Sequence, residues 1–157
     1  MQKAILEKKN QGAPIFMAQV GLLEDNTRIA KLCATMLHYM GHQVTVYGHP
    51  RQCLYALLPE AISNVHSQHT SPKPLPIEVL ILDLYLPDIP GIEVLRRLQS
   101  NPQTQRLPLI LCTAAPGSDV ARALSIAPRA GFVEKPFKLQ SLTLAIAKAL
   151  KSASATS

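Results

Sequence analysis

One stretch decides the fold of this 157-residue chain: Val79-Leu80-Ile81-Leu82-Asp83-Leu84-Tyr85-Leu86-Pro87-Asp88-Ile89-Pro90-Gly91. Apolar residues run unbroken up to one carboxylate, and a loop rich in proline and glycine follows. Such a short run of branched residues is typical of a strand that is buried on both faces of a parallel sheet. Parallel sheets bind ligands at the carboxyl ends of their strands, so Asp83 is predicted to point into a site. The alternative is that Asp83 only caps a helix.

The same pattern recurs on both sides of this strand. Short apolar runs predict strands within 16–23, 44–46, 77–82, 107–112 and 131–133, and apolar residues at helical spacing follow each of them. Asn26 is a good cap for the first helix, Leu32 and Cys33 belong to its predicted buried face, and Gly41 is expected to end it. Five strands alternating with five helices predict a single doubly wound α/β domain, a (βα)5 unit with helices on both faces of one parallel sheet.

The predicted domain covers residues 16–151. Residues 1–15 are expected to form a flexible basic extension, and residues 152–157 a frayed C-terminal tail. Residues 63–76 are rich in serine and proline, which predicts a loop insertion between the second helix and the third strand. His66 and His69 lie in it, but two histidines without a cysteine or carboxylate partner make a poor metal site, so a solvated loop is favoured.

Composition narrows the function classes. The content of 47% hydrophobic and 17% charged residues is that of a globular chain, and the net charge is +6. The basic residues are scattered and tryptophan is absent, which favours solvated helix faces over a direct nucleic-acid interface. Cys33, Cys53 and Cys112 match no metal-ligand spacing and fit a reducing cytoplasm. No apolar run is long enough to span a bilayer, so we expect a cytoplasmic protein without a membrane partner.

Residues capable of chemistry follow four of the predicted strands: Glu24-Asp25, Asp83, Thr113 and Lys135. Taken singly, each has a simpler explanation, such as acids favoured in a first helical turn, a strand-end threonine or a surface lysine. Because the carboxyl ends of parallel strands share one edge of the sheet, we expect the four to meet there. Together they predict a functional site.

The complete set resembles the receiver domain of two-component response regulators over about residues 16–150. The motifs are Glu24-Asp25, Asp83 followed by Leu86-Pro87 and Gly91, Thr113-Ala114, and Lys135-Pro136-Phe137. Thr113 lies 30 residues after Asp83, and Lys135 lies 22 residues after Thr113, as is typical of the family. The resemblance implies a flavodoxin-like sheet with strand order 2-1-3-4-5.

The resemblance also implies a phosphoacceptor. Asp83 would take a phosphoryl group from a histidine kinase or a phosphotransfer protein, with Mg²⁺ as cofactor. Mg²⁺ prefers oxygen ligands. Beside Asp83, the ligands would be Asp25 directly, Glu24 through water, and the backbone carbonyl of Tyr85. Lys135 and the Thr113 hydroxyl would contact phosphoryl oxygens.

Switching would follow phosphorylation. Small Ala114 would leave room for the phosphodonor, and Thr113 would couple to Phe132, for which a plain core role is the alternative. A downstream protein would bind helix 4, strand 5 and helix 5, where Leu144 and Ala147 are expected on an outer stripe; a homodimer is a further option. We therefore expect the protein to be a stand-alone receiver and not an enzyme. The one reaction expected of it alone is slow loss of its own phosphoryl group. The alternative function is a phosphate-independent interaction module.

Three features depart from the family pattern. The first acid is Glu24, one methylene longer than Asp; residues 63–76 lengthen the path to Asp83; and Pro128-Arg129 precede the fifth strand in place of the usual Gly-Ala. Pro128 lacks an amide donor, so a short or irregular fourth helix is expected. A flavodoxin-like metabolic enzyme is disfavoured, since no glycine-rich phosphate loop follows the first strand.

Overall fold

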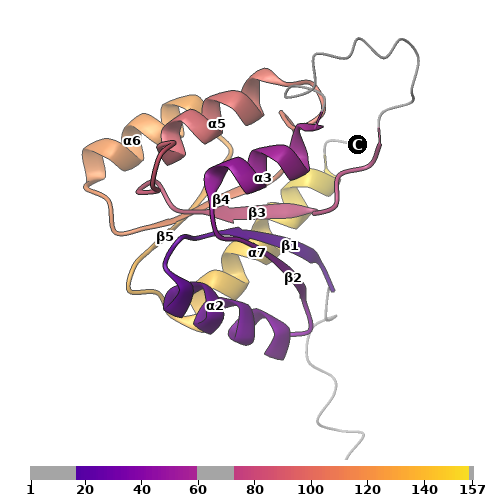
Figure 1. Cartoon of the computed structure of the whole chain (residues 1–157). Coiled ribbons are helices and arrows are strands. Elements are labelled where there is room, and N and C mark those ends of the chain that lie inside the picture. The colour runs from indigo at the N-terminus through magenta and orange to yellow at the C-terminus, as the bar shows by residue number, and fades with distance from the viewer. Residues whose placement is uncertain (1–16, 60–72, 156–157) are drawn as a thin grey trace, which may run out of the picture.

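The computed structural model describes residues 17–59 and 73–155 (Figure 1). Within these residues, five parallel strands form one sheet in the order β2-β1-β3-β4-β5, which confirms the predicted strand order. The strands are β1 Gln19–Leu23, β2 Gln43–Tyr47, β3 Val79–Leu82, β4 Leu109–Thr113 and β5 Gly131–Glu134. The helices are α2 Thr27–Tyr39, α3 Pro50–Leu57, α5 Gly91–Ser100, α6 Gly117–Ile126 and α7 Leu139–Ser154.

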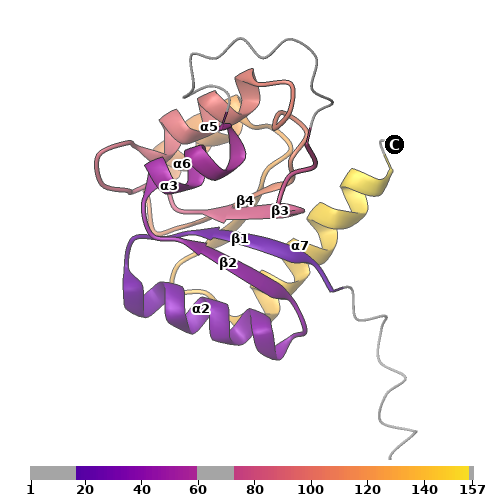
Figure 2. The same ribbon diagram turned by 45° about the vertical axis from the view of Figure 1, so that its right-hand side comes forward.

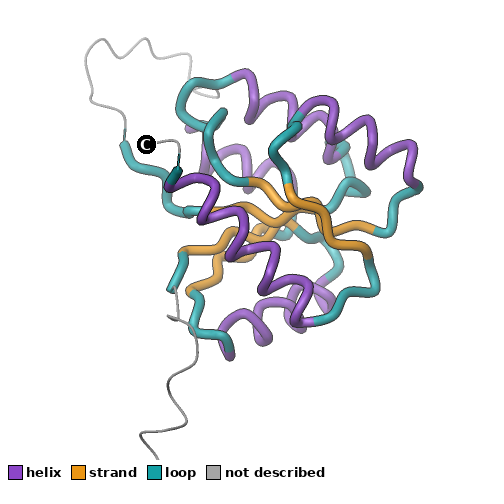
Figure 3. The backbone as a smooth tube through the Cα atoms, turned by 180° about the vertical axis from the view of Figure 1, so that it is seen from behind, coloured by secondary structure: helices purple, strands orange, loops and turns teal. Residues whose placement is uncertain are grey.

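Helices cover both faces of the sheet. In Figures 1 and 2, α3, α5 and α6 lie on one side of it and α2 on the other, and Figure 3 shows α7 crossing the same face as α2 from behind. Alternate residues of β3 serve the two cores, because successive side chains of a strand point to opposite faces. Leu80 and Leu82 pack with α3, α5 and α6, whereas Val79 and Ile81 pack with α2 and α7. The predicted doubly wound α/β class is therefore confirmed.

Both ends of α2 lie at the residues that were predicted to begin and end it. The side chain of Asn26 accepts hydrogen bonds from the backbone N–H groups of Arg28 at 3.1 Å and Ile29 at 3.2 Å. Gly41, with φ of 91°, lies just beyond the last turn, in the left-handed region that glycine adopts without strain. The predicted burial of Leu32 is wrong, because this side chain is 58% exposed. Ala30, Cys33 and Leu37 face the sheet, and Leu32 projects more than a third of a turn away from the centre of that face.

Element boundaries differ from the predictions at three places. β1 and β3 begin at Gln19 and Val79, later than expected, and Phe16 lies outside the described residues. The frayed tail predicted from residue 152 is wrong for 152–154, since α7 continues to Ser154 with Ala153 half-buried. The expected irregularity of the fourth helix is also wrong, because α6 has ten regular residues and ends before Pro128, so that proline removes no helical hydrogen bond. Residues 1–15 and His66 and His69 lie outside the described ranges.

Gly91 is required where α5 meets the loop that follows β3. A Cβ atom on this residue would lie 2.6 Å from the Leu84 Cα and closer still to the Asp83 carbonyl oxygen. We expect Gly91→Ala to lower the free energy of unfolding by about 1–3 kcal/mol through overpacking, measured by urea denaturation. The matched control is Gly117→Ala, at the first residue of α6, where an added Cβ meets no atom within 4 Å. Equal stability of the two variants would contradict this account.

Candidate functional site

The site lies at the carboxyl edge of the sheet. Val20 and Leu22 of β1 pack on the same face as Val79 and Ile81 of β3. Continuing the two-residue alternation beyond each strand brings Glu24 and Asp83 to that same face, towards α2 and α7. The backbone N–H of Asp83 also donates to the carbonyl of Leu23 at 3.2 Å, which holds the two strand ends together.

Lys135 connects the two carboxylates. Its Nζ donates to Glu24 Oε1 and to Asp83 Oδ2, at 2.7 Å in each case. All three side chains are largely buried, with exposed fractions of 14% for Lys135, 4% for Glu24 and 11% for Asp83. Charge-assisted hydrogen bonds of this length are strong ones. The predicted proximity of Lys135 to Asp83 is therefore present, and a contact with Glu24 accompanies it.

Glu24 has an unsatisfied oxygen. Within the described part of the chain, its Oε2 is buried and has no hydrogen-bond partner. Burial raises the pKa of Glu24, and the nearby charges of Asp83 and Asp25 raise it further, against the lowering effect of Lys135. For Lys135, burial acts to lower the pKa, but the hydrogen bonds and charges of Asp83 and Glu24 outweigh it and the pKa is raised. The cluster therefore carries an excess of negative charge beside one unpaired acceptor.

The chemistry of this cluster fits a hard divalent cation. Glu24, Asp25, Asp83 and Lys135 together carry a formal charge of −2, and carboxylate oxygens are the ligands that Mg²⁺ prefers. Asp25 is exposed, whereas Glu24 is the acid buried beside Asp83. In the described ranges, no three His, Cys, Asp or Glu side chains are arranged so that they could hold a metal ion. The donor set thus fits Mg²⁺ in charge and type, while two of its three carboxylates, those of Glu24 and Asp83, are bound to Lys135.

Thr113 and Lys135 are joined through the backbone. The N–H of Lys135 donates to the Thr113 carbonyl at 3.0 Å, so the ends of β4 and β5 stay in register. The Thr113 side chain is fully buried, and its Oγ1 accepts a hydrogen bond from the Ala115 N–H at 3.1 Å. Ala114 is exposed. The buried hydroxyl of Thr113 is therefore followed directly in the chain by the small, exposed Ala114.

Tyr85 makes two contacts. Its backbone N–H donates to Asp83 Oδ1 at 3.2 Å, and its hydroxyl donates to Asp119 Oδ2 on α6 at 2.7 Å. The hydrogen bond to Asp119 is the main reason why the pKa of Tyr85 is raised. Sequence reasoning chose Tyr85 only for its carbonyl and missed Asp119, which lies 34 residues away with no pattern to connect them.

The predicted switch residue lies at the surface. Phe132 on β5 is 44% exposed, which rules out the alternative of a plain core phenylalanine. On α7, Leu144 is 70% exposed and Ala147 is exposed as well, as predicted for its outer stripe. Exposed apolar side chains are therefore present on β5 and α7, two of the three elements predicted to bind a downstream protein.

The cysteines are packed rather than reactive. Cys33, Cys53 and Cys112 are free and buried, and burial raises the pKa of Cys33 to about 11 and that of Cys112 to about 12. Both thiols stay protonated at neutral pH, and they line the buried space behind Glu24, Asp83 and Lys135. Together with the aliphatic residues that line the same space, they form an apolar wall beside the carboxylates.

The chain is similar to known proteins along most of its length. A model of the response regulator receiver domain matches residues 20–147. The phosphate regulon transcriptional regulatory protein PhoB of Rhizobium meliloti is 40% identical over 77 residues, which cover 48% of this chain and 34% of that protein. The uncharacterized transcriptional regulatory protein YkoG of Bacillus subtilis is 30% identical over 131 residues, covering 83% of this chain and 50% of that one. The chain therefore spans a third to a half of these relatives.

Solved structures show the same fold. A response regulator receiver domain protein from Clostridium thermocellum superimposes with a TM-score of 0.70 at 21% identity, over 90% of this chain and all of that one. A putative response regulator from Chloroflexus aurantiacus gives a TM-score of 0.71 at 20% identity, over 86% and 98% of the two chains. With the family model matched along most of its length, this chain belongs to the response regulator receiver domain family of two-component systems.

Proposed function

We propose that this receiver domain accepts a phosphoryl group on Asp83 from a histidine kinase or phosphotransfer protein. The observation that carries the proposal is the buried Lys135 ammonium, 2.7 Å from both Asp83 and Glu24. In the transfer, a carboxylate oxygen of Asp83 forms a bond to phosphorus while the bond from phosphorus to the donor histidine nitrogen breaks. Lys135 then neutralises charge on the transferred group without leaving its position.

Mg²⁺ belongs to the same proposal, since receiver domains generally bind it at their acidic pocket. The residues that would hold it are Glu24, Asp25 and Asp83, with the backbone carbonyl of Tyr85. When bound, the ion would neutralise negative charge on the phosphoryl oxygens. The unpaired, buried Oε2 of Glu24 supports this assignment, because a buried acceptor without a partner is costly unless a cation or a donor reaches it.

Thr113 and Phe132 would carry the signal away from Asp83. The Thr113 hydroxyl is free to exchange its bond from the Ala115 N–H for one to a phosphoryl oxygen, and Ala114 leaves the approach open. Receiver domains interact with histidine kinases and with downstream effectors. Here we assign the effector face to α6, β5 and α7, where Phe132 and Leu144 are exposed, and a second copy of the chain is the other candidate occupant.

The protein would then act as a switch rather than as an enzyme, with slow loss of its own phosphoryl group as the only turnover. A cytoplasmic location fits this proposal, supported by three buried cysteines that form no disulfide in the described part of the chain. Separately, none of the described helices combines the length and the apolar character needed to cross a membrane.

The test is phosphorylation of the intact protein by acetyl phosphate, followed by mass spectrometry. With Mg²⁺ present, we expect the mass of one phosphoryl group to be added, because the ion and Lys135 together offset the charge that accumulates around Asp83. Chelation of the ion with EDTA should abolish the addition, and excess Mg²⁺ should restore it. A protein that stays unmodified with Mg²⁺, or is modified equally in EDTA, would refute the proposal.

A phosphate-independent interaction module is the second candidate. The arrangement that favours it is the engagement of both buried carboxylates by Lys135, with no three metal-ligating side chains poised for an ion among the residues described. An NMR titration with Mg²⁺ separates the two functions. Saturable shifts of the Asp25, Asp83 and Tyr85 amides support the phosphoacceptor, and their absence supports the module.

A further inference from the structure

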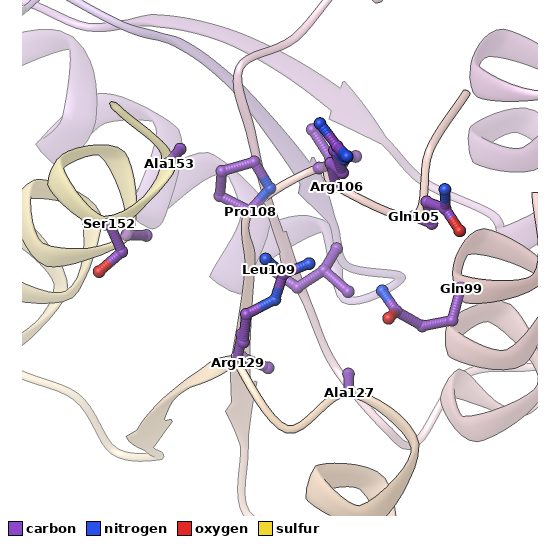
Figure 4. A pocket seen from close by; sticks show the side chains of 12 residues that line it. Gln99, Gln105, Arg106, Pro108, Leu109, Ala127, Arg129, Ser152 and Ala153 are labelled. Atoms are coloured by element: carbon purple, nitrogen blue, oxygen red, sulfur yellow. The ribbon is translucent and has the colours of Figure 1, made fainter. Parts of the chain in front are cut away.

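A second cavity lies at the opposite edge of the sheet from Asp83. It has a volume of about 330 Å³, at the lower end of the range for small-molecule sites. Its walls come from the segment before β4, the segment before β5, the last turn of α5 and the last turns of α7 (Figure 4). Because these are the amino ends of parallel strands, the cavity shares no lining residue with the acidic site.

The charge of this cavity is positive. Arg106 and Arg129 both line it, and none of its lining residues is acidic. Within residues 17–59 and 73–155, neither guanidinium takes part in a hydrogen bond or an ion pair. In Figure 4, Arg129 extends towards Leu109 at the centre of the cavity, and Arg106 lies near its upper rim. Two exposed arginines that line one hollow and have no ion-pair partner among the described residues are suited to a phosphate group, which guanidiniums bind through paired N–H donors.

The rest of the lining suits the body of an organic ligand. Gln99 and Gln105 lie together on one side of the cavity, and their side-chain amides can both donate and accept hydrogen bonds (Figure 4). Leu107 and Leu109 are buried and form an apolar floor, and small alanines of the β5 approach and of α7 leave the space open. A bare inorganic anion would use the arginines but neither the floor nor the glutamine amides.

We propose that this cavity binds a small organic phosphate of about the size of a nucleoside monophosphate. The phosphate would lie between Arg106 and Arg129, and the partly apolar, hydrogen-bonding body would rest on Leu109 beside the glutamines. Arg106 and Arg129 are both exposed, so the other use open to them is as solvated surface charges. That use would not by itself require a cavity between the arginines or glutamine side chains on its wall. The inference is independent of phosphorylation at Asp83.

The test is an NMR titration of the full chain with AMP and with CMP, with inorganic phosphate and adenosine as separate arms. We expect at least one nucleotide to shift the amide signals of 105–109 and 127–130 saturably, and to bind at least about tenfold more tightly than inorganic phosphate or adenosine, since each of these lacks half of the contacts. No shift with either nucleotide would overturn the proposal. Equal affinity for inorganic phosphate would also overturn it, as simple attraction of an anion to exposed arginines.

Amino-acid substitutions test whether the nucleotide binds in this cavity. Arg106→Gln with Arg129→Gln should weaken nucleotide binding about tenfold or more. The control pair Arg96→Gln with Arg122→Gln removes the same charge from α5 and α6 outside the cavity, and should leave the affinity unchanged. Ser152→Trp keeps every charge but fills the cavity from α7, and should also prevent binding. Equal weakening by both arginine pairs, or undiminished binding by Ser152→Trp in a folded protein, would contradict a site in this cavity.

Discussion

Asp83→Asn is expected to leave the protein unmodified by acetyl phosphate and Mg²⁺ under conditions that phosphorylate the wild type completely. The single oxygen of asparagine can accept only one of the two hydrogen bonds that the Asp83 carboxylate accepts from Lys135 and the Tyr85 N–H. The backbone hydrogen bond from residue 83 to the Leu23 carbonyl still holds the strand ends together. A carboxamide, however, is no nucleophile for phosphorus and cannot form an acyl phosphate. The loss should therefore be complete rather than partial, and intact-mass spectrometry measures it directly.

The matched control is Asp88→Asn. Asp88 lies in the same loop, is exposed, and accepts a hydrogen bond from Arg51 at 2.6 Å. This variant loses the same charge five residues away but should be phosphorylated like the wild type. Unfolding in urea shows whether both variants are folded. A folded Asp83→Asn protein that still gains a phosphoryl group, or an Asp88→Asn protein that gains none, would show that the acceptor has been misassigned.

Lys135→Gln should have the largest effect on stability. The change removes the ammonium group between Glu24 and Asp83 and leaves two buried carboxylates without a counter-charge. Breaking a buried ion pair by removing one partner costs about 3–5 kcal/mol. We expect a loss of that order in urea denaturation near neutral pH. Lys138→Gln is the control, because this exposed lysine of the same loop has no ion-pair partner among the described residues and its loss should cost almost nothing.

The pH dependence of this loss has a definite sign. The pKa of Lys135 is raised in the folded protein, so its stabilising contribution is complete below the unfolded value of 10.5 and is lost as the pH rises through the folded value. The raised pKa of Glu24 works in the same sense at acid pH, favouring the folded state below 4.5 and less so as the carboxyl ionises. Without Lys135, ionisation of the buried Glu24 carboxyl destabilises the folded state more strongly. The Lys135→Gln variant should therefore regain stability on acidification from neutral pH towards about 5. A stability difference that does not change with pH would contradict the ion-pair explanation.

The site could be predicted from the sequence because the carboxyl end of a parallel strand can be recognised where its apolar run ends. The unbroken apolar run of β3 predicts a buried strand, and the strand alternation then brings Glu24 and Asp83 to one face. The same reasoning misplaced Leu32, since Leu32 and Cys33 are adjacent apolar residues and periodicity alone does not decide which of them faces the sheet. It also ended α7 too early, because an Ala/Ser-rich tail contains no stop signal, and Ala153 is half-buried.

Contacts between distant side chains could not be predicted. That Lys135 binds Glu24 as well as Asp83 depends on side-chain conformations across 111 residues of sequence. The bond between Tyr85 and Asp119 has no counterpart in any local pattern. Glu24 is buried with Asp83 around Lys135 whereas Asp25 is exposed, a difference that only the folded chain reveals. The assignment of Asp25 as the direct metal ligand stays a prediction. The cavity of Arg106 and Arg129 likewise forms only where segments separate in sequence come together.

The most direct test of the central claim is chemical mapping of the phosphoryl group. After treatment with acetyl phosphate and Mg²⁺, borohydride reduces an aspartyl phosphate to homoserine with release of phosphate, and peptide mass spectrometry then locates the converted residue. We predict homoserine at position 83, and at that position alone. Homoserine at Asp25, Asp88 or Asp119, or a phosphorylated protein in which no aspartate is converted, would contradict the assignment of Asp83 as the phosphoacceptor.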